Sequence, residues 1–339
     1  MSHESDISSS RLSGISYALV AAALWLVLHL HLLPVLLSGL LVYTLINALA
    51  PWLQRLLPGT QAHWVLVALL SAAVVGLLSF AIAGGIAYLG SESGNPTILF
   101  ERMGPVIERA RAQLPAFVID HLPSNAEQIR DAIMAWLSEH AGQLQLAGAN
   151  AARVIVHLLI GMILGAMLAL QMALAQSPGG PLTVVLKKRC ENLVIAFHDI
   201  VFAQVKISAL NTLFTGIFLL VVLPLFGVNL PLAKTLVLVT FICGLLPVLG
   251  NLISNTIIFV IGLSVSLWVA VAALTFLILI HKLEYFLNAR IIGTQIRSRA
   301  WELLIAMLLM EAAFGIGGLI AAPIYYAYLK RELEAKALI

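Results

Sequence analysis

The chain has 339 residues, of which 61% are hydrophobic and only 10% are charged, and its mean hydropathy is +1.02. Soluble domains carry about 45–50% apolar and about 25% charged residues, so this composition excludes a large soluble enzyme and a disordered chain. The net charge of +3 is too small to suggest a nucleic acid or another polyanion as partner. Because the apolar runs reach the roughly 20 residues that a membrane-crossing helix needs, the sequence predicts an all-α polytopic membrane protein.

Residues 1–90 are predicted to form an N-terminal three-span region. Their apolar runs cover residues 15–33, 35–50 and 63–89. Pro34 and Pro51 directly follow the first two runs, and proline removes a backbone donor and bends a helix. These two runs are therefore either two spans or one span and a short return.

Residues 91–150 differ in character from the rest of the chain. They contain four arginines and seven acidic residues, and no run long enough to span a membrane. Apolar residues recur there at intervals of three and four, which is typical of amphipathic helices. We predict a small extracytoplasmic helical element, which is either a structural cap or a ligand-binding module.

Residues 151–204 are predicted to contain a fourth span and a basic amphipathic segment on the cytoplasmic side. The span covers about residues 152–175 and includes Gly161 and Gly165, a G-x-x-x-G spacing that allows close helix approach. The run Lys187-Lys188-Arg189 opens the basic segment.

Residues 205–339 are predicted to be the transport region, because their apolar segments are interrupted. A fifth span covers residues 205–226, Pro247 and Gly250 break the next segment, and a long span is expected to end near His281. A further break lies at residues 314–318. Non-helical backbone at membrane depth is tolerated only where it is buried in protein or lines a cavity, so such breaks point to a transport site; kinked packing helices are the alternative.

Lysine and arginine gather in the short connections at residues 11, 55, 187–189, 290–299 and 330–331. The positive-inside rule places these connections and both termini in the cytoplasm. In total we expect about eight membrane segments, including broken or re-entrant helical hairpins.

The motifs of the common enzyme chemistries are missing from the sequence. Lys234-Thr235 lacks the glycines of a P-loop, there is no C-x-x-C, and the two cysteines offer no disulfide framework. We therefore expect neither an enzyme nor a cofactor or metal site.

Glu311 is the clearest ionisable residue within an apolar segment. Such groups are costly to bury and are functional candidates by default. A carboxylate here would suit a proton- or sodium-coupled carrier; alternatively it faces an aqueous cavity or an arginine and only holds the structure.

Asn251 and Asn255 share a helix face and would either bind a polar solute or hold helices together. The predicted substrate or ion pathway consists of Pro247, Gly250, Asn251, Asn255, Glu311, Gly315, Gly317 and Gly318.

Several short motifs follow one another in the second half of the chain. They are Ala203-Gln204, Gly227-Val228-Asn229-Leu230-Pro231, Leu246-Pro247-Val248-Leu249-Gly250, the segment Glu284 to Gly293, and Phe314-Gly315-Ile316-Gly317-Gly318 followed by Ala322-Pro323. In this order they resemble the autoinducer-2 exporter family of bacterial transporters. Ala289 stands where the family signature has proline, and Glu311 where the family usually has a small or apolar residue.

The resemblance implies a homo-oligomeric, multi-pass protein of the bacterial inner membrane that acts as an exporter; some relatives are assigned quorum-signal export and others sodium/proton antiport. It also implies signature or gating roles for Gln204, Glu284, Asn288, Arg290, Gly293 and Pro323.

Three functions are therefore open. The first is a secondary transporter that exports a small polar molecule, and the second is a Na+(Li+)/H+ antiporter that uses Glu311. The third is a non-transporting membrane scaffold or regulator that docks partners on residues 91–150. The partners expected are membrane lipid, a small polar solute or a monovalent cation and proton, and further copies of the chain.

Overall fold

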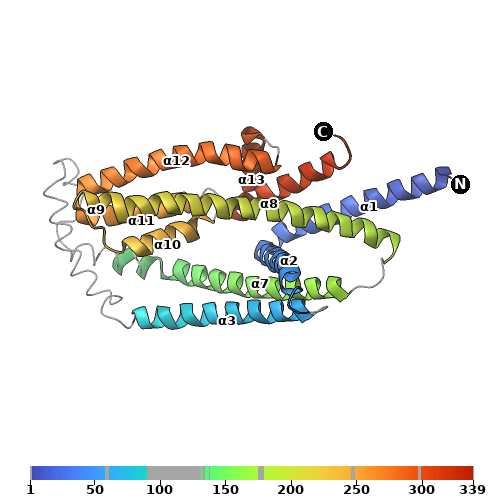
Figure 1. Ribbon diagram of the computed structural model, residues 1–339, viewed down its shortest axis with the longest axis horizontal. Coiled ribbons are helices and arrows are strands. Elements are labelled where there is room, and N and C mark those ends of the chain that lie inside the picture. Colours follow the sequence, from blue (N-terminus) through green and yellow to red (C-terminus); the bar gives the residue numbers. More distant parts are fainter. Residues whose placement is uncertain are drawn as a thin grey trace. The chain divides into compact units, whose positions relative to one another are not determined.

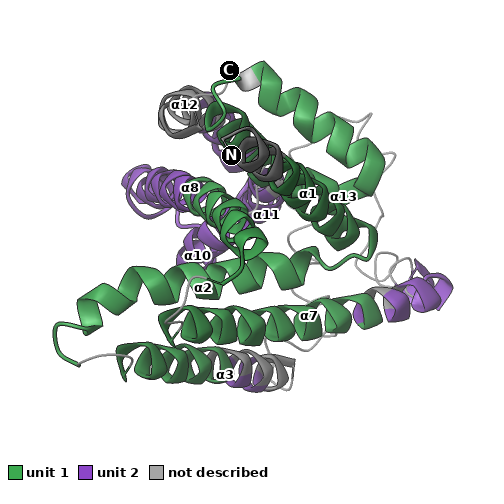
Figure 2. Cartoon of the chain, turned by 90° about the vertical axis from the view of Figure 1, so that its right-hand side faces the viewer, with its two compact units in different colours: residues 1–76, 149–201, 292–339 green, residues 77–148, 202–291 purple. Residues whose placement is uncertain are grey.

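The computed structural model describes residues 2–57, 61–89, 131, 134–136, 138–174, 179–245, 249–296 and 299–338. The described residues are almost entirely helical, and none of them forms a strand. Contacts divide the chain into two compact units (Figure 2), unit 1 with Met1–Gly76, Ala149–Val201 and Ile292–Ile339, and unit 2 with Leu77–Gly148 and Phe202–Ile291. The prediction of an all-α fold is confirmed.

Among the described residues, five segments are long and apolar enough to cross a membrane, judged by length and composition: Arg11–His29, Leu33–Leu53, Ala141–Leu174, Pro181–Leu225 and Trp301–Glu334. The first four of these segments lie in α1 (Ser2–His29), α2 (Leu33–Leu53), α7 (Ala141–Leu174) and the helix that begins with α8 (Pro181–Ile217) (Figure 1). Between α2 and α7 lies α3 (Gln61–Leu89), whose apolar stretch is shorter. The chain is therefore a polytopic membrane protein, as its composition predicts. The extracytoplasmic element predicted at residues 91–150 lies mostly outside the described residues.

In unit 1, α7 packs tightly against α2 through glycines. A methyl group at Gly161 would lie 2.1 Å from Ser38 Oγ, and one at Gly165 would lie 2.2 Å from the carbonyl oxygen of Gly39. No side chain fits at either position, so the close approach predicted from the G-x-x-x-G spacing is confirmed.

Helix α13 (Ala300–Glu334), also in unit 1, reverses direction at Gly315, where φ is 62° and ψ is −145°. Lys330 Nζ lies 3.2 Å from Glu302 Oε2. Along a straight helix these two residues would be about 42 Å apart, at 1.5 Å per residue. The break predicted at residues 314–318 is thus the tip of a helical hairpin, with a first arm at residues 300–314 and a second at residues 316–334.

Helix α8 runs without interruption through the predicted basic amphipathic segment and past Val205, where the fifth span is predicted to start. The start of the span within this helix stays a prediction. It passes into a π-helical turn, η1 (Phe218–Val222), and then into α9 (Leu223–Leu225). Pro224 explains the π turn, because it lacks the N–H that an α-helix would need and its ring crowds the carbonyl one turn earlier. The N–H of Leu223 accordingly bonds the carbonyl of Phe218, five residues back.

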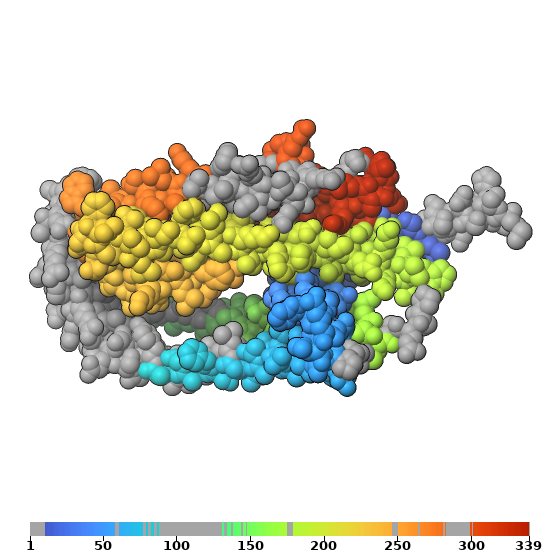
Figure 3. Space-filling view, in the orientation of Figure 1, coloured from blue at the N-terminus to red at the C-terminus, as the bar shows by residue number. Residues whose placement is uncertain are grey.

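Unit 2 contains a second helical hairpin, formed by α10 (Ala233–Gly244) and α11 (Leu249–Val265). At 1.5 Å per residue these helices are about 18 and 25 Å long, shorter than a hydrocarbon core of about 30 Å. A methyl group at Gly250 would lie 1.9 Å from the carbonyl oxygen of Cys243, so the two helices meet closely at the connection. The side chains of this hairpin lie against the C-terminal part of α8 (Figure 3).

Helix α12 (Leu267–Ile296) begins directly after α11. Ser266 Oγ accepts the N–H of Val269 at 3.1 Å and so caps the new helix. Ser266 therefore separates two helices within the long segment that was expected to end near His281. The apolar part of α12, Leu267–Ile280, does end there, although the helix itself continues to Ile296.

Candidate functional site

One face of α8 carries a row of polar residues in unit 2, which we call the polar stripe: Gln204, Ser208, Asn211 and Thr215. Their spacings of four, three and four residues place them on one side of the helix. Ser208, Asn211 and Thr215 are buried, with 1%, 7% and 0% of their surface exposed. Polar residues in an apolar helix are expected to face protein or a cavity rather than lipid.

The polar stripe binds the hairpin of α10 and α11. Gln204 Nε2 donates a hydrogen bond to the carbonyl of Gly244, and Ser208 Oγ donates one to the carbonyl of Phe241, both at 2.7 Å. The last four carbonyls of a helix have no partner within the helix. The stripe therefore caps the end of α10, where the apolar segment is broken.

Asn251, on the first turn of α11, belongs to the same network. Its Oδ1 accepts a hydrogen bond from Asn211 Nδ2 at 2.9 Å, so this asparagine holds the hairpin to α8. Asn255, one turn later, is half-buried, and its side chain has no hydrogen-bond partner within the described part of the chain. The two asparagines that sequence reasoning treats as a pair thus differ in their contacts. Pro247 lies outside the described residues.

Thr215 and Thr212 carry buried hydroxyl groups for which the described residues provide no hydrogen-bond partner. Thr215 comes three residues before the π-helical turn η1, and such turns are frequent at functional sites. An unpaired buried hydroxyl costs about 1–3 kcal/mol, so a polar solute that bound it would recover that energy. Sequence reasoning missed both threonines, although the i, i+4, i+7 polar pattern of α8 is a signal that could have revealed them.

Glu311 lies on the first arm of the α13 hairpin in unit 1, one turn before its tip. Its side chain is exposed, and none of the basic side chains described in the structure forms an ion pair with it. The tip itself needs glycine at two positions. Gly315 has a positive φ, and a methyl group at Gly318 would lie 1.9 Å from the carbonyl oxygen of Met310.

The structure shows fewer contacts for the remaining predicted residues. Gly317 has open space around its Cα, and Pro323 is buried in the second arm of the hairpin. Glu284, Asn288, Arg290 and Gly293 lie on the last part of α12, where the structure describes no side chains, so their signature roles stay predictions.

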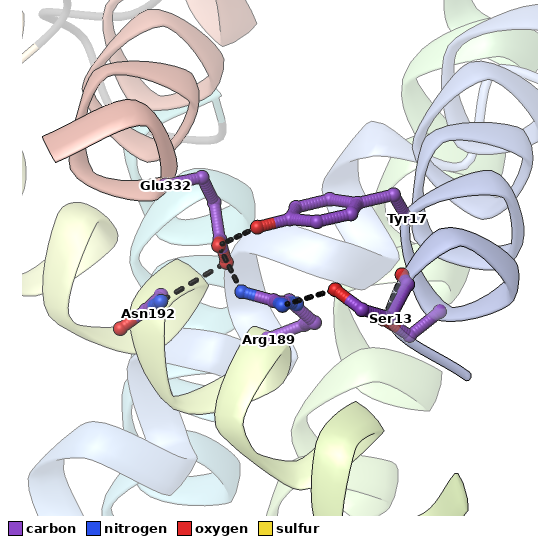
Figure 4. Close-up of polar contacts among 6 residues, drawn as sticks. Ser13, Tyr17, Arg189, Asn192 and Glu332 are labelled. Carbon is purple, nitrogen blue, oxygen red and sulfur yellow. Dashed lines mark hydrogen bonds and ion pairs between the residues drawn. The ribbon is translucent and has the colours of Figure 1, made fainter. Parts of the chain in front are cut away.

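Unit 1 contains a buried ion pair that was not predicted from the sequence (Figure 4). Arg189 of α8 binds the carboxylate of Glu332, near the end of the second α13 arm. Asn192 Nδ2 and the Tyr17 hydroxyl donate to the same carboxylate at 3.0 and 3.1 Å, and the Arg189 guanidinium lies 4.0 Å from the centre of the Tyr17 ring. Since 143 residues separate the two charges, no local spacing in the sequence links them.

In the described part of the chain, no group of three or more His, Cys, Asp or Glu side chains is placed to hold a metal ion. The described residues define a polytopic α-helical membrane protein in which a polar stripe holds the α10–α11 hairpin and a carboxylate lies near the tip of the α13 hairpin.

Residues 15–337 match the model of the AI-2E family transporter, so the chain belongs to this family. Its members are membrane transporters rather than enzymes, and the chain is accordingly a multi-pass membrane protein of a transporter family. Comparisons with curated proteins and with solved structures gave no match.

Proposed function

We propose that this chain is a secondary transporter that exports a small polar molecule across the bacterial inner membrane. The observation that carries the proposal is the polar stripe of α8 set against the α10–α11 hairpin. Broken helices supply transport sites because their free backbone groups and polar neighbours lie within the membrane.

The chemistry of this region favours an uncharged or weakly charged polar solute. The groups that face one another are amides, hydroxyls and backbone carbonyls, and the buried ones include no charged side chain. Much of their hydrogen-bonding capacity already joins α8 to the hairpin. The hydroxyls of Thr212 and Thr215 and the amide of Asn255 are the groups that we assign to the solute.

Replacement of Thr215 by valine tests this assignment, because it removes the hydroxyl and keeps the side-chain shape. We expect efflux of the solute to fall roughly tenfold, which corresponds to the loss of one hydrogen bond of about 1.4 kcal/mol. The thermal stability should stay the same or rise, since the hydroxyl has no partner among the described residues. The measurement is efflux of a panel of preloaded small polar solutes from sealed proteoliposomes.

Thr275→Val is the matched control, because Thr275 is exposed on α12 and its hydroxyl bonds the carbonyl of Val271 in its own helix. It should leave efflux unchanged. Equal efflux in both variants would contradict the site. Wild-type efflux no faster than from empty liposomes, with the protein folded, would favour the scaffold or regulator function instead.

Na+(Li+)/H+ antiport is the second candidate, and the position of Glu311 favours it. An exposed carboxylate on an apolar arm, next to a hairpin tip, could exchange a proton for a cation. If antiport is the function, Glu311→Gln should abolish the pH change that sodium or lithium drives in proteoliposomes loaded with a pH dye. If the chain exports an uncharged solute, this variant should retain efflux within about twofold, less than the tenfold effect of a lost 1.4 kcal/mol contact.

Glu334→Gln provides the control for that measurement, because Glu334 is an exposed acid at the end of the same helix. A cation-driven pH change that survives both substitutions would exclude Glu311 as the coupling group.

The cytoplasmic position of both termini, homo-oligomeric assembly and the re-entry of the hairpins into the membrane belong to the same proposal. The distribution of lysine and arginine supports the position of the termini, and the shortness of α10 and α11 supports re-entry. Homo-oligomeric assembly is inferred from membership of the family alone.

A further inference from the structure

A groove of about 520 Å³ lies in unit 1 between α1 and the two arms of α13. Helices α1 and α13 run side by side in both ribbon views (Figures 1 and 2). The Tyr325 hydroxyl donates to the carbonyl of Leu24 at 3.2 Å, and Tyr17 donates to Glu332. The second arm is therefore antiparallel to α1, and the two helices form the long walls of the groove.

The walls change from apolar to polar along the length of the groove. Leu28, Met310 and Phe314 line one end, and Tyr17, Glu332 and Lys336 line the other. From Tyr17 to Leu28 the α1 wall is about 16 Å long at 1.5 Å per residue, roughly half of a hydrocarbon core of about 30 Å. The groove thus has the length of one leaflet, and its charged side chains, Glu332 and Lys336, lie at one end only.

The charge at the polar end is positive. The Glu332 carboxylate is already bound by Arg189, Asn192 and Tyr17. Lys336 Nζ lies 4.5 Å from the centre of the Tyr17 ring, and no carboxylate of the described residues forms an ion pair with it. An occupant that complements both ends has an apolar chain and an anionic head.

We propose that this groove binds an anionic phospholipid, with an acyl chain along α1 and the phosphate at Lys336. Basic pockets between membrane helices are known to take anionic headgroups. A volume of 520 Å³ falls in the range of about 300–1,000 Å³ for small-molecule pockets, which suits a single lipid better than a second protein surface. The bound lipid would contact the second arm of the α13 hairpin and hold it against α1.

The test measures thermal unfolding of the full chain in a neutral detergent, with added phosphatidylglycerol, phosphatidylcholine or inorganic phosphate. At a concentration near 100 times Kd, phosphatidylglycerol should raise Tm by about 5 °C. Phosphatidylcholine and inorganic phosphate should raise Tm by less than a third of that. Phosphatidylcholine has the acyl chain but no net negative charge, and inorganic phosphate has the negative charge but no acyl chain.

Two pairs of variants locate the effect. Ala21→Phe fills the groove and should abolish the phosphatidylglycerol shift, whereas Ala22→Phe, an equally exposed neighbour on α1 that does not line the groove, should keep it. Lys336→Gln should reduce the shift at least threefold, whereas Lys234→Gln, an exposed lysine of unit 2, should not.

Equal shifts in Ala21→Phe and Ala22→Phe would overturn the proposal, and so would equal shifts in the two lysine variants. A lower oligomeric mass for Ala21→Phe, measured by light scattering and unaffected by lipid, would also overturn it, because it would identify the groove as a contact between copies of the chain. Lys336→Gln keeps the test decisive if the aromatic substitution prevents folding, since Lys336 is exposed.

Discussion

Glu332→Leu is expected to lower the free energy of unfolding by about 3–5 kcal/mol, since it leaves the Arg189 guanidinium buried without a counter-charge. The side chains of the two residues are only 3% and 9% exposed. Their removal from water is costly, and the cost is offset only while the pair is intact. Asn192 and Tyr17, which also donate to the carboxylate, would lose their acceptor in the same variant.

A double-mutant cycle measures this coupling. Arg189→Met alone should also destabilise the protein, but Arg189→Met combined with Glu332→Leu should recover most of the loss, because apolar side chains often replace a buried ion pair without penalty. Chemical denaturation in detergent, followed by tryptophan fluorescence, provides the measurement.

The exposed pair Arg331–Asp199 is the control for the cycle. Its charges are 3.5 Å apart, and the two side chains are 36% and 25% exposed. Arg331→Met should therefore cost only about 0–1 kcal/mol. Similar losses for the buried and the exposed pair would show that the Glu332 cluster is not an anchor for the second arm of α13.

The positions of the helices and of their breaks could be predicted from the sequence, because the signals for both are local. A membrane span is indicated by an apolar run of about 20 residues. A break is indicated by a proline, or by a glycine that no other residue can replace, at the position of the break itself. The run at residues 63–89 corresponds to α3, and the glycine cluster at residues 314–318 marks the tip of a hairpin. Gly161 and Gly165 likewise indicated a close helix contact, although not the identity of α2 as the partner.

Contacts between distant segments could not be predicted in the same way. The basic run at residues 187–189 was predicted to open a basic amphipathic segment, but the sequence did not indicate that α8 continues through it and buries Arg189 against Glu332. The charges near His281 indicated the end of an apolar span, and the apolar part of α12 does end at Ile280, but the helix itself continues to Ile296. In both places polarity indicates which face of a helix meets protein or water, rather than where the helix ends.

Some residues of the candidate site could be predicted from local sequence signals, and others could not. Gly250 and Asn251 were identified because they lie at a visible break, whereas Ser208, Asn211 and Thr215 lie inside a continuous helix. Their importance depends on the α10–α11 hairpin, which packs against that face of α8. A polar stripe in an apolar helix is visible in the sequence, but its partner is not.

Gly315→Ala is expected to change the conformation of the α13 hairpin. At φ 62° and ψ −145° the backbone is in a region that is nearly exclusive to glycine, so alanine would cost about 1–3 kcal/mol at the hairpin tip. Because a straight, continuous helix relieves that strain, the variant should populate a form in which the two arms of α13 separate. We expect transport to fall about tenfold or more, as a shift of 1.4 kcal/mol or more implies.

Distance measurements between spin labels at Leu304 and Leu329 test this directly, because both side chains are exposed and lie on opposite arms. A straight helix would place these residues about 38 Å apart, at 1.5 Å per residue, whereas the arms of a hairpin keep them close. Gly317→Ala is the matched control, since a methyl group there meets nothing within 4 Å and the φ of Gly317 is not positive. If both alanine variants kept the short distance and full transport, the reversal at Gly315 would not depend on glycine, and the hairpin would have to be held by its arm contacts, such as Glu302 with Lys330, alone.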